Sequence, residues 1–434
     1  MRSLRRICGL VLAIMLLVCV AASSGQQISK SDRDLAQRML HDVAAGIKKY
    51  YYDPQLHGID WDLKVRRAQE NIDKADSMDS AISEIAALLE GLNDSHTALI
   101  LPPRNYVHKY GFSLRMVGDR CYVTRVDADS DAEQKGLKRG DQVLAVDDLP
   151  VTRKTYWKIE YVFQSLRPQP ALRLTLAGEN GQPRRLDPMA KVEPSPVIKY
   201  RLHQGINQMV RDWKDEYALL EPQFFEKGDE LLAVRIPAFA LSATGVDYVL
   251  GRMRRHKGVV LDLRGNPGGF TESLDRFVGG MFENDLKLYD RVRRDSTKPI
   301  SVSGRHHDAF TGRLVVLVDS GSASASELFA RVMQLEKRAF VMGDRSAGMV
   351  MEAMTYRHEI SVDTNNFYGA EITISDLIMT DGKSLEHAGV EPDILILPTA
   401  QDIAARRDPV MAKAAGLAGV KVTPEEAGSM FPEK

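Results

Sequence analysis

The sequence predicts an α/β fold with more than one domain, of the α+β multidomain kind. Between residues 29 and 92, apolar residues recur at four-residue steps, which is typical of amphipathic helices. Residues 110–192 contain runs in which apolar and polar residues alternate, as in half-buried strands. From residue 194 onward, short apolar runs are followed by small-residue turns and helical patterns, which indicates an α/β core. We therefore expect a small helical N-terminal unit, a β-rich module and an α/β core.

The composition excludes some classes of function. The chain has 434 residues, which is enough for two or three domains. Its 58 basic and 59 acidic residues give a formal net charge of −1, so there is no electrostatic argument for nucleic-acid binding. No cluster of cysteine and histidine has the spacing of metal ligands, and we expect neither a metal nor a cofactor.

The N-terminus has the order of a secretory signal. Arg2, Arg5 and Arg6 precede the apolar run from Ile7 to Ala22, and small residues follow it. This run is shorter than the roughly 20 residues of a membrane-spanning helix, although an uncleaved membrane anchor is the alternative. We expect an exported protein, periplasmic or secreted, with no stable membrane span after signal removal. Cys121 would then be the one cysteine left of three, so no intrachain disulfide could form.

The helical N-terminal unit ends in a polar segment with a histidine. Three runs at helical spacing precede it: residues 35–47, a run from Trp61, and residues 82–92. The segment itself reads Asn93-Asp94-Ser95-His96-Thr97. It can be a loop in which Ser and Asp satisfy backbone groups, or it can present His96 as a general base beside Ser95. The second interpretation requires a nucleophile elsewhere in the chain.

The β-rich module resembles a PDZ domain. It contains a Gly-Phe-Ser-Leu loop from Gly111 to Leu114, a short helix that ends in Gly-Leu, and the run Gly-Asp-Gln-Val-Leu-Ala-Val from residue 140. PDZ domains add the C-terminus of a peptide as a strand to a sheet edge. The resemblance implies that the N–H groups around Gly111, Phe112 and Ser113 bind the terminal carboxylate. A β-module that only packs or regulates is the alternative.

Two turns between a strand and a helix in the core present unpaired N–H groups. The first turn, Arg264-Gly265-Asn266-Pro267-Gly268-Gly269, lacks the Gly-Lys-Ser/Thr ending of a phosphate loop, so donors for an oxyanion fit better. The second follows Leu314–Val318 and runs from Ser320 to Ser326 before a helical pattern that Glu327 opens. A serine on such a turn has the geometry of a nucleophile with half an oxyanion hole. An ordinary helix capped by serine is the alternative.

Together these motifs resemble the C-terminal-processing (tail-specific) serine proteases, the family that also contains the tricorn protease core. Five motifs stand in the family's order: residues 93–97, the PDZ-like module, 262–269, 322–327 and 389–393. The resemblance implies an endopeptidase that hydrolyses peptides or unfolded proteins and selects C-termini through its PDZ domain. The implied organisation is a signal peptide (1–24), an N-terminal helical region (29–103), a PDZ domain (104–192), a serine protease core (194–400) and a C-terminal helical tail (401–434).

The resemblance also implies the nucleophile and the oxyanion hole. The family's nucleophile is the middle serine of Ser-Ala-Ser-Ala-Ser-Glu, which is Ser324 in this sequence. Ser326 would then cap the helix. The N–H of Ala325 and that of Gly268 or Gly269 would bind the oxyanion, for which backbone groups suffice.

One position departs from the better-known branch of the family, which activates its serine with a lysine. Met349 stands at the matching place, and a thioether cannot take a proton from serine. The tricorn-like branch instead uses Ser-His-Glu with a helper serine, and His96, Glu386 and Ser95 match it. In that case His96 takes the proton of Ser324 and later gives it to the leaving amine, while Glu386 orients the imidazole and Ser95 hydrogen-bonds to the carboxylate.

Alternatives remain open on the sequence alone. Asp381 or Glu391 could take the role of Glu386. A catalytically inert PDZ-containing scaffold that binds peptides is the first rival function, and Met349 motivates it. A carrier of a lipophilic ligand is the second, on fold analogy alone.

Overall fold

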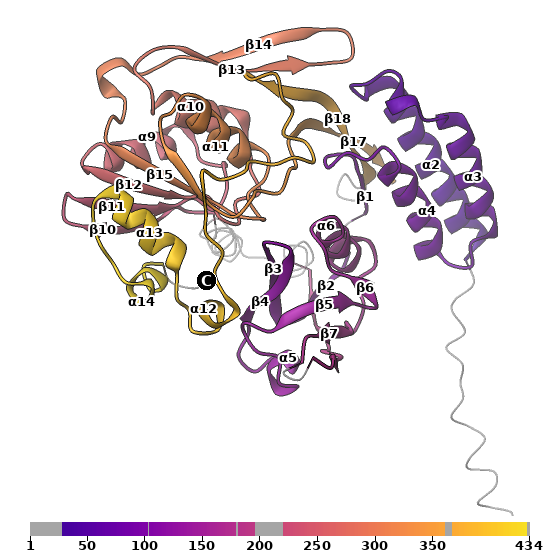
Figure 1. The fold of residues 1–434 in the computed structure, drawn as a ribbon. Helices are drawn as coiled ribbons and strands as arrows, with labels where there is room; N and C mark the ends of the chain where they lie inside the picture. Colours follow the sequence, from indigo (N-terminus) through magenta and orange to yellow (C-terminus); the bar gives the residue numbers. More distant parts are fainter. Residues whose placement is uncertain (1–27, 103, 179–180, 196–219, 361–366, 432–434) are drawn as a thin grey trace, which may run out of the picture.

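The structure is a computed structural model that describes residues 28–102, 104–178, 181–195, 220–360 and 367–431. The expected signal peptide lies outside the described residues. In these ranges no helix is both long and apolar enough to cross a membrane. Helices and strands are mixed throughout, which confirms the predicted α/β multidomain fold (Figure 1).

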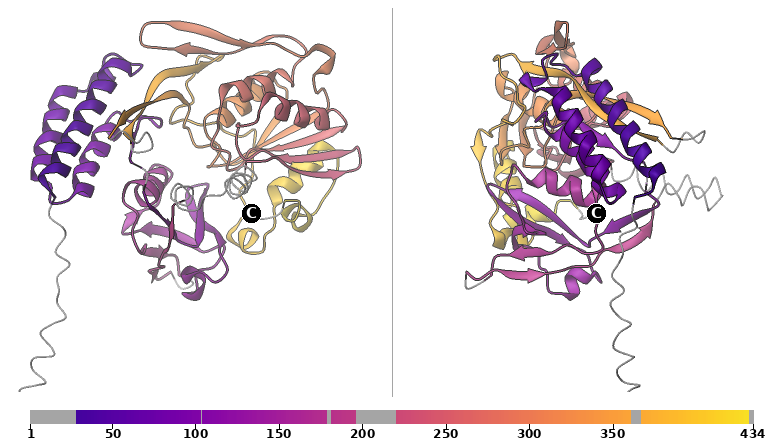
Figure 2. Two further views of the ribbon diagram at one scale, coloured as in Figure 1. Left: turned by 180° about the vertical axis from the view of Figure 1, so that it is seen from behind. Right: turned by 90° about the vertical axis from the view of Figure 1, so that its right-hand side faces the viewer.

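Three helices form the N-terminal unit at one end of the molecule (Figures 1 and 2). Each begins after a residue whose side chain accepts a backbone N–H of the first turn: Ser29, Asp60 and Ser77. Their apolar faces share one core with residues of strand β18 (Phe367–Met379), so the unit is joined to the rest of the chain. The helices are α2 (Lys30–Tyr50), α3 (Trp61–Lys74) and α4 (Met78–Glu90).

The PDZ-like module is an antiparallel sheet of six strands in the order β3-β4-β5-β7-β8, with β6 paired to β5. Strand β3 therefore forms an edge of this sheet. Cys121 is buried in the module as a free thiol. The elements are β3 (Phe112–Val117), β4 (Arg120–Val126), α5 (Asp131–Gln134), β5 (Gln142–Val146), β6 (Leu149–Pro150), α6 (Tyr156–Glu160), β7 (Leu174–Leu176) and β8 (Arg184–Leu186); a ribbon of β2 (Tyr106–Lys109) and β9 (Lys191–Pro194) adjoins them.

The α/β core is a six-stranded sheet in the order β10-β11-β12-β15-β16-β19, parallel except for β10. Every residue of β12 is buried, because helices cover both faces of the sheet. The strands are β10 (Gln223–Lys227), β11 (Leu231–Arg235), β12 (Gly258–Asp262), β15 (Arg313–Val318), β16 (Phe340–Gly343) and β19 (Ile394–Leu395). The helices are α9 (Ala243–Met253), α10 (Thr271–Gly279) and α11 (Ala325–Leu335) on one face, and α13 (Pro409–Ala418) and α14 (Pro424–Gly428) on the other, with α12 (Ala400–Ala404) before them.

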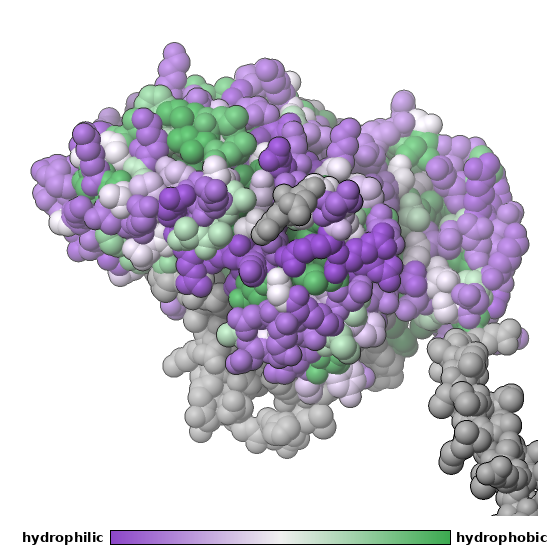
Figure 3. All heavy atoms as spheres, turned by 60° about the horizontal axis from the view of Figure 1, so that its bottom comes forward, coloured by the Kyte–Doolittle hydropathy of each residue, from purple (hydrophilic) through white to green (hydrophobic). Residues whose placement is uncertain are grey.

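A second sheet, in the order β1-β18-β13-β14 with β17 also paired to β18, connects the helical unit to the core. The PDZ-like module lies opposite this second sheet, between the helical unit and the α/β core (Figures 1 and 2). Seen from the module's side, hydrophilic residues cover most of the surface and apolar residues form separate patches (Figure 3). The strands are β1 (Ala98–Ile100), β13 (Leu286–Val292), β14 (Thr297–Val302), β17 (Met351–Glu359) and β18 (Phe367–Met379).

Candidate active site

Ser324 lies on a strained turn between β15 and α11. Its backbone has φ 54° and ψ −118°, a conformation that residues with a side chain rarely adopt and that costs about 1–3 kcal/mol. The Ser324 N–H lies 2.8 Å from the carbonyl of Met349 and 3.0 Å from Oε2 of Glu327. These contacts hold the turn that presents the serine side chain at the end of the strand.

Glu327 fixes this turn to the loop around Met349. Its buried carboxylate accepts four hydrogen bonds, from the N–H of Ser324, Gly348 and Met349 and from Oγ of Ser346. Burial raises the pKa of Glu327 to about 7, and the four donors oppose this shift. From the sequence, Glu327 is expected only to open the helix. The sequence signal for this role is an acidic residue three positions after a serine at the start of a helix, because such an acid can bind the backbone N–H of that serine.

Ser95 joins His96 to Glu386. Its Oγ lies 2.8 Å from Nδ1 of His96 and 2.9 Å from Oε2 of Glu386, and its N–H donates to Oε1 of Glu386 at 2.8 Å. Burial raises the pKa of the Glu386 carboxyl, whose side chain is 9% exposed, and hydrogen bonds from Val350 and Ser95 oppose the shift. Burial lowers the pKa of His96.

This order of contacts sets the tautomer of the imidazole. The single hydroxyl proton of Ser95 can be donated to the carboxylate, and Nδ1–H of His96 then donates to the Ser95 oxygen. Nε2 of His96 is left without a proton and can accept one. Ser95 hydrogen-bonds to the Glu386 carboxylate, and the contact between Glu386 and the imidazole runs through the Ser95 hydroxyl.

The segment Gly348–Val350 connects the two halves of the site. The carbonyl of Met349 accepts from Ser324, and the N–H of Val350 donates to Oε2 of Glu386 at 2.8 Å. Within the described chain, no hydrogen bond joins Ser324 to His96. In free enzymes such catalytic hydrogen bonds often form only when substrate is bound.

The two other candidate carboxylates have different partners. Asp381 pairs with Arg331 at 2.6 Å, and Glu391 lies 3.6 Å from Arg345. Glu386 is held beside residues 93–97 because Nε2 of the next residue, His387, lies 2.7 Å from the carbonyl of Asn93. Of the three carboxylates, the geometry therefore favours Glu386.

The glycine loop packs directly against Ser324. Gly268 has φ +100°, and a Cβ there would lie 2.7 Å from Cβ of Ser324, so a side chain would push the loop away. The N–H of Gly268 already donates to Oδ1 of Asn266 at 2.8 Å. Among the described residues, the N–H groups of Gly269 and Ala325 have no acceptor. The Ala325 N–H directly follows Ser324 in the chain, and the Gly269 N–H directly follows Gly268, which packs against the serine.

The neighbouring serines of the motif support the loop. Oγ of Ser326 donates to the carbonyl of Asn266 at 2.9 Å, so it joins the two turns and does not cap the helix as predicted. Oγ of Ser322 donates to the carbonyl of Leu263 at 2.7 Å. Both residues are completely buried, which is consistent with a structural role.

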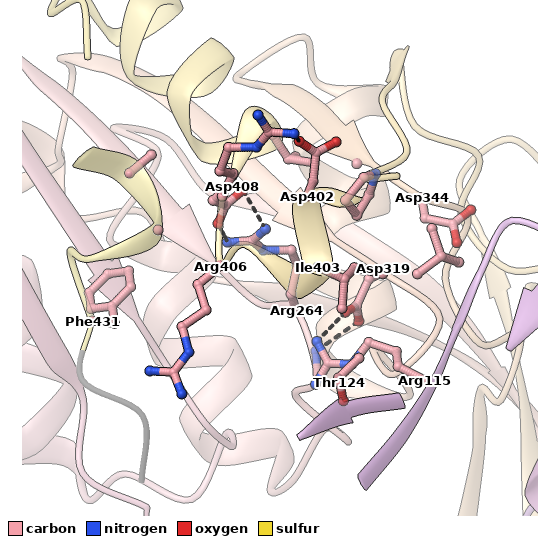
Figure 4. A pocket seen from close by; sticks show the side chains of 18 of the residues that line it. Arg115, Thr124, Arg264, Asp319, Asp344, Asp402, Ile403, Arg406, Asp408 and Phe431 are labelled. Atoms are coloured by element: carbon pink, nitrogen blue, oxygen red, sulfur yellow. Dashed lines mark hydrogen bonds and ion pairs between the residues drawn. The ribbon is translucent and has the colours of Figure 1, made fainter. Parts of the chain in front are cut away.

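Asp319 connects the PDZ-like module to both turns. Its Oδ1 accepts from the N–H groups of Gly265 and Gly321, at 2.8 and 2.9 Å, and its Oδ2 accepts from Arg115 of β3 at 2.7 Å. Arg115 and Asp319 line a cavity of about 490 Å³ at the carboxyl ends of the core strands, beside the C-terminal helices (Figure 4). Ser324, His96 and Glu386 do not line this cavity.

The predicted carboxylate-binding loop precedes the edge strand of the module. Gly111 has φ +74°, and a Cβ there would lie 2.4 Å from Cβ of Ser130. Phe112 and Ser113 begin β3. All three residues line a cavity of about 1030 Å³ between the module and β1, and the last two also line a smaller one beside α6. The loop is thus open to a ligand at the sheet edge.

Comparisons with known proteins agree with this arrangement. Residues 230–396 match Peptidase family S41, and residues 99–164 match the PDZ domain. The chloroplastic carboxyl-terminal-processing peptidase 1 of Arabidopsis thaliana is 24% identical over 342 residues, 76% of this chain and 65% of that protein. The tail-specific protease of Haemophilus influenzae is 26% identical over 326 residues, 69% of this chain and 43% of that protein. The chain thus spans less than two thirds of the length of both relatives.

The fold is also found in a solved structure. Mature CPAF matches with a TM-score of 0.63 at 14% sequence identity, over 86% of this chain and 95% of that chain. At this identity the likeness concerns the fold alone.

Proposed function

Because the chain joins a domain of peptidase family S41 to a PDZ domain, we propose that it is a serine endopeptidase of the C-terminal-processing kind. One observation carries the proposal. Ser95 bridges His96 and Glu386, while Ser324 stands on a strained turn that packs against the Gly268 loop. This combination supplies a nucleophile, a base with a defined tautomer and an oxyanion hole.

In the proposed reaction, Oγ of Ser324 attacks the carbonyl carbon of the substrate while Nε2 of His96 takes its proton. The negative charge of Glu386 stabilises the imidazolium through Ser95. The N–H groups of Gly269 and Ala325 bind the oxyanion. His96 then protonates the leaving amine, and water hydrolyses the acyl-enzyme with His96 again as base.

The histidine mechanism is favoured over a lysine mechanism at this site. Met349 contributes its backbone to the turn, and its side chain has no basic group. Ser324, His96, Glu386 and Ser95 therefore form the proposed catalytic group.

The proposed substrates are peptides or unfolded proteins, selected at their C-termini by the PDZ domain. Gly111, Phe112 and Ser113 supply the carboxylate-binding loop in this proposal. The N-terminal sequence supports export to the periplasm or beyond the cell, with a retained membrane anchor as the alternative.

A serine-reactive fluorophosphonate probe tests the mechanism without knowledge of the substrate. We expect the wild type to be labelled, and Ser324→Ala and His96→Ala to lose the label. Ser301→Ala, which changes an exposed serine of β14, is the matched control and should label normally. Labelling that persists in Ser324→Ala would refute the assigned nucleophile. A peptide that binds but survives overnight would favour the inert scaffold.

A further inference from the structure

The residue that follows Glu386 has a strained backbone. His387 has φ +59°, in the left-handed region that residues with a side chain seldom adopt. It contacts Asn93, whose φ of +55° lies in the same region. Histidine and asparagine enter this region more often than most residues. Two of them in direct contact, next to a proposed catalytic carboxylate, nevertheless indicate that the surrounding structure holds both in place.

Two hydrogen bonds of His387 join three segments of the site. Its Nε2 lies 2.7 Å from the carbonyl oxygen of Asn93, on the segment that carries His96. Its backbone N–H donates to the carbonyl of Gly348 at 2.8 Å, on the segment that passes behind Ser324. The turn that carries the catalytic carboxylate is therefore attached to both halves of the site.

The contact with Asn93 fixes a proton on the imidazole of His387. A carbonyl oxygen can only accept a hydrogen bond, so at 2.7 Å the Nε2 atom must carry a hydrogen. The side-chain nitrogen of Asn93 is farther away, at 3.4 Å. The same Nε2 atom lies 3.7 Å from Oε1 of Glu386, which already accepts the N–H of Ser95. The positive end of the Nε2–H dipole thus lies near the carboxylate.

This arrangement favours the ionised form of Glu386. Burial raises the pKa of its carboxyl, and the hydrogen bonds from Val350 and Ser95, together with the neighbouring His387, oppose the shift. Among the residues that the structure describes, no lysine or arginine pairs with Glu386, so His387 is the basic group nearest to it. A carboxylate that stays ionised and stationary can accept the Ser95 hydroxyl proton and so orient His96.

We propose that His387 is a positioning residue of the proposed reaction, and that its Nε2–H group holds the carboxylate of Glu386 within hydrogen-bonding reach of Ser95. In this role it touches neither the substrate nor the reacting atoms, because it acts through the carboxylate. The inference rests on the proposed serine-peptidase function and adds a residue that the reaction requires.

The rate of labelling by a fluorophosphonate probe, measured on the full-length chain, tests this role without a known substrate. We expect His387→Ala to slow labelling by about tenfold, because the carboxylate would shift as well as lose a neighbouring donor. His387→Gln should recover most of the rate, since the glutamine amide nitrogen can take the place of Nε2 and donate to the same carbonyl. His307→Ala, which removes an exposed histidine from the turn His306–Asp308, is the matched control and should label normally.

A double-mutant cycle with Ser95→Ala separates positioning from a general effect on the fold. If His387 acts through Glu386 and the hydroxyl of Ser95, replacing it by alanine should slow labelling by less than about twofold once that hydroxyl is absent. A full tenfold loss in the Ser95→Ala background would refute the proposal, because the effect would then bypass the carboxylate.

The outcomes distinguish this inference from the proposed function. If the wild type is not labelled, the proposed serine mechanism fails and the inference fails with it. If the wild type and His387→Ala are labelled equally fast, the mechanism stands and the positioning role is refuted. A His387→Gln variant as slow as His387→Ala would also refute it, because the donated hydrogen would then not be the feature that matters.

Discussion

At the scale of single residues, the proposed chemistry depends on the hydroxyl of Ser95. We expect Ser95→Ala to lower kcat by about 100-fold. This effect is larger than that of losing one ordinary hydrogen bond, and smaller than the loss of about 10⁴-fold in kcat when the carboxylate of a catalytic triad is disabled. The backbone N–H of the new alanine would still bind Glu386, so the fold should persist. KM should change little, since Ser95 does not bind the substrate in this proposal.

Steady-state kinetics on a peptide substrate measures this effect, and Ser95→Thr is the conservative control. Threonine retains a hydroxyl between His96 and Glu386, and we expect it to recover most of the lost kcat. Equal activity of Ser95→Ala and wild type would show that Glu386 does not act through this residue.

The types of these residues could be predicted from the sequence, but their order of contact could not. The motif around His96 places Ser95 beside it in the sequence. It does not tell whether the Ser95 hydroxyl lies between the imidazole and the carboxylate of Glu386 or contacts the carboxylate from another side. The side chain of Asn266 likewise occupies the N–H of Gly268 only because the turn folds back on itself. Such choices depend on a few ångströms of loop geometry, which no spacing encodes.

At the scale of elements, periodic segments were predictable and irregular ones were not. The helical run near residues 35–47 lies in α2, and the run near 82–92 lies in α4 up to its end at Glu90, as their spacing predicts. Strand β14 was missed because four of its six residues are exposed and Pro299 interrupts its pattern. Strand β16 was missed because it has only four residues and begins with the exposed Phe340.

The junction of α11 with the loop around Met349 should make stability depend on pH. The Glu327 carboxyl titrates near 4.5 in an unfolded chain and at about 7 in the folded protein. The folded state therefore binds more protons between these values. The contribution of Glu327 to stability is fully present below pH 4.5 and is lost as pH rises through 7, by at most about 3 kcal/mol.

Urea unfolding at pH 5 and pH 8 measures this dependence. We expect the free energy of unfolding of the wild type to fall between the two values, and Glu327→Gln to show a smaller fall because it has no group that titrates there. Glu336→Gln, at the exposed end of the same helix, should behave like the wild type. If the free energy of unfolding of the wild type rose from pH 5 to pH 8, and this rise were absent in Glu327→Gln, the raised pKa assigned to Glu327 would be contradicted.

At the scale of the whole molecule, Asp319 couples the PDZ domain to both turns of the active site. It binds Arg115 on one side and the N–H groups of Gly265 and Gly321 on the other. Loss of the Arg115 charge should loosen this contact and let the two turns shift relative to Ser324. We expect Arg115→Gln to lower kcat severalfold on a short amidated peptide, because misplaced oxyanion donors stabilise the transition state less while substrate binding changes little.

Arg185→Gln, which removes an exposed charge from the same module, is the matched control. Equal kcat values for the two variants would mean that the module and the catalytic turns are energetically independent, and a change confined to KM would assign Arg115 to substrate binding alone.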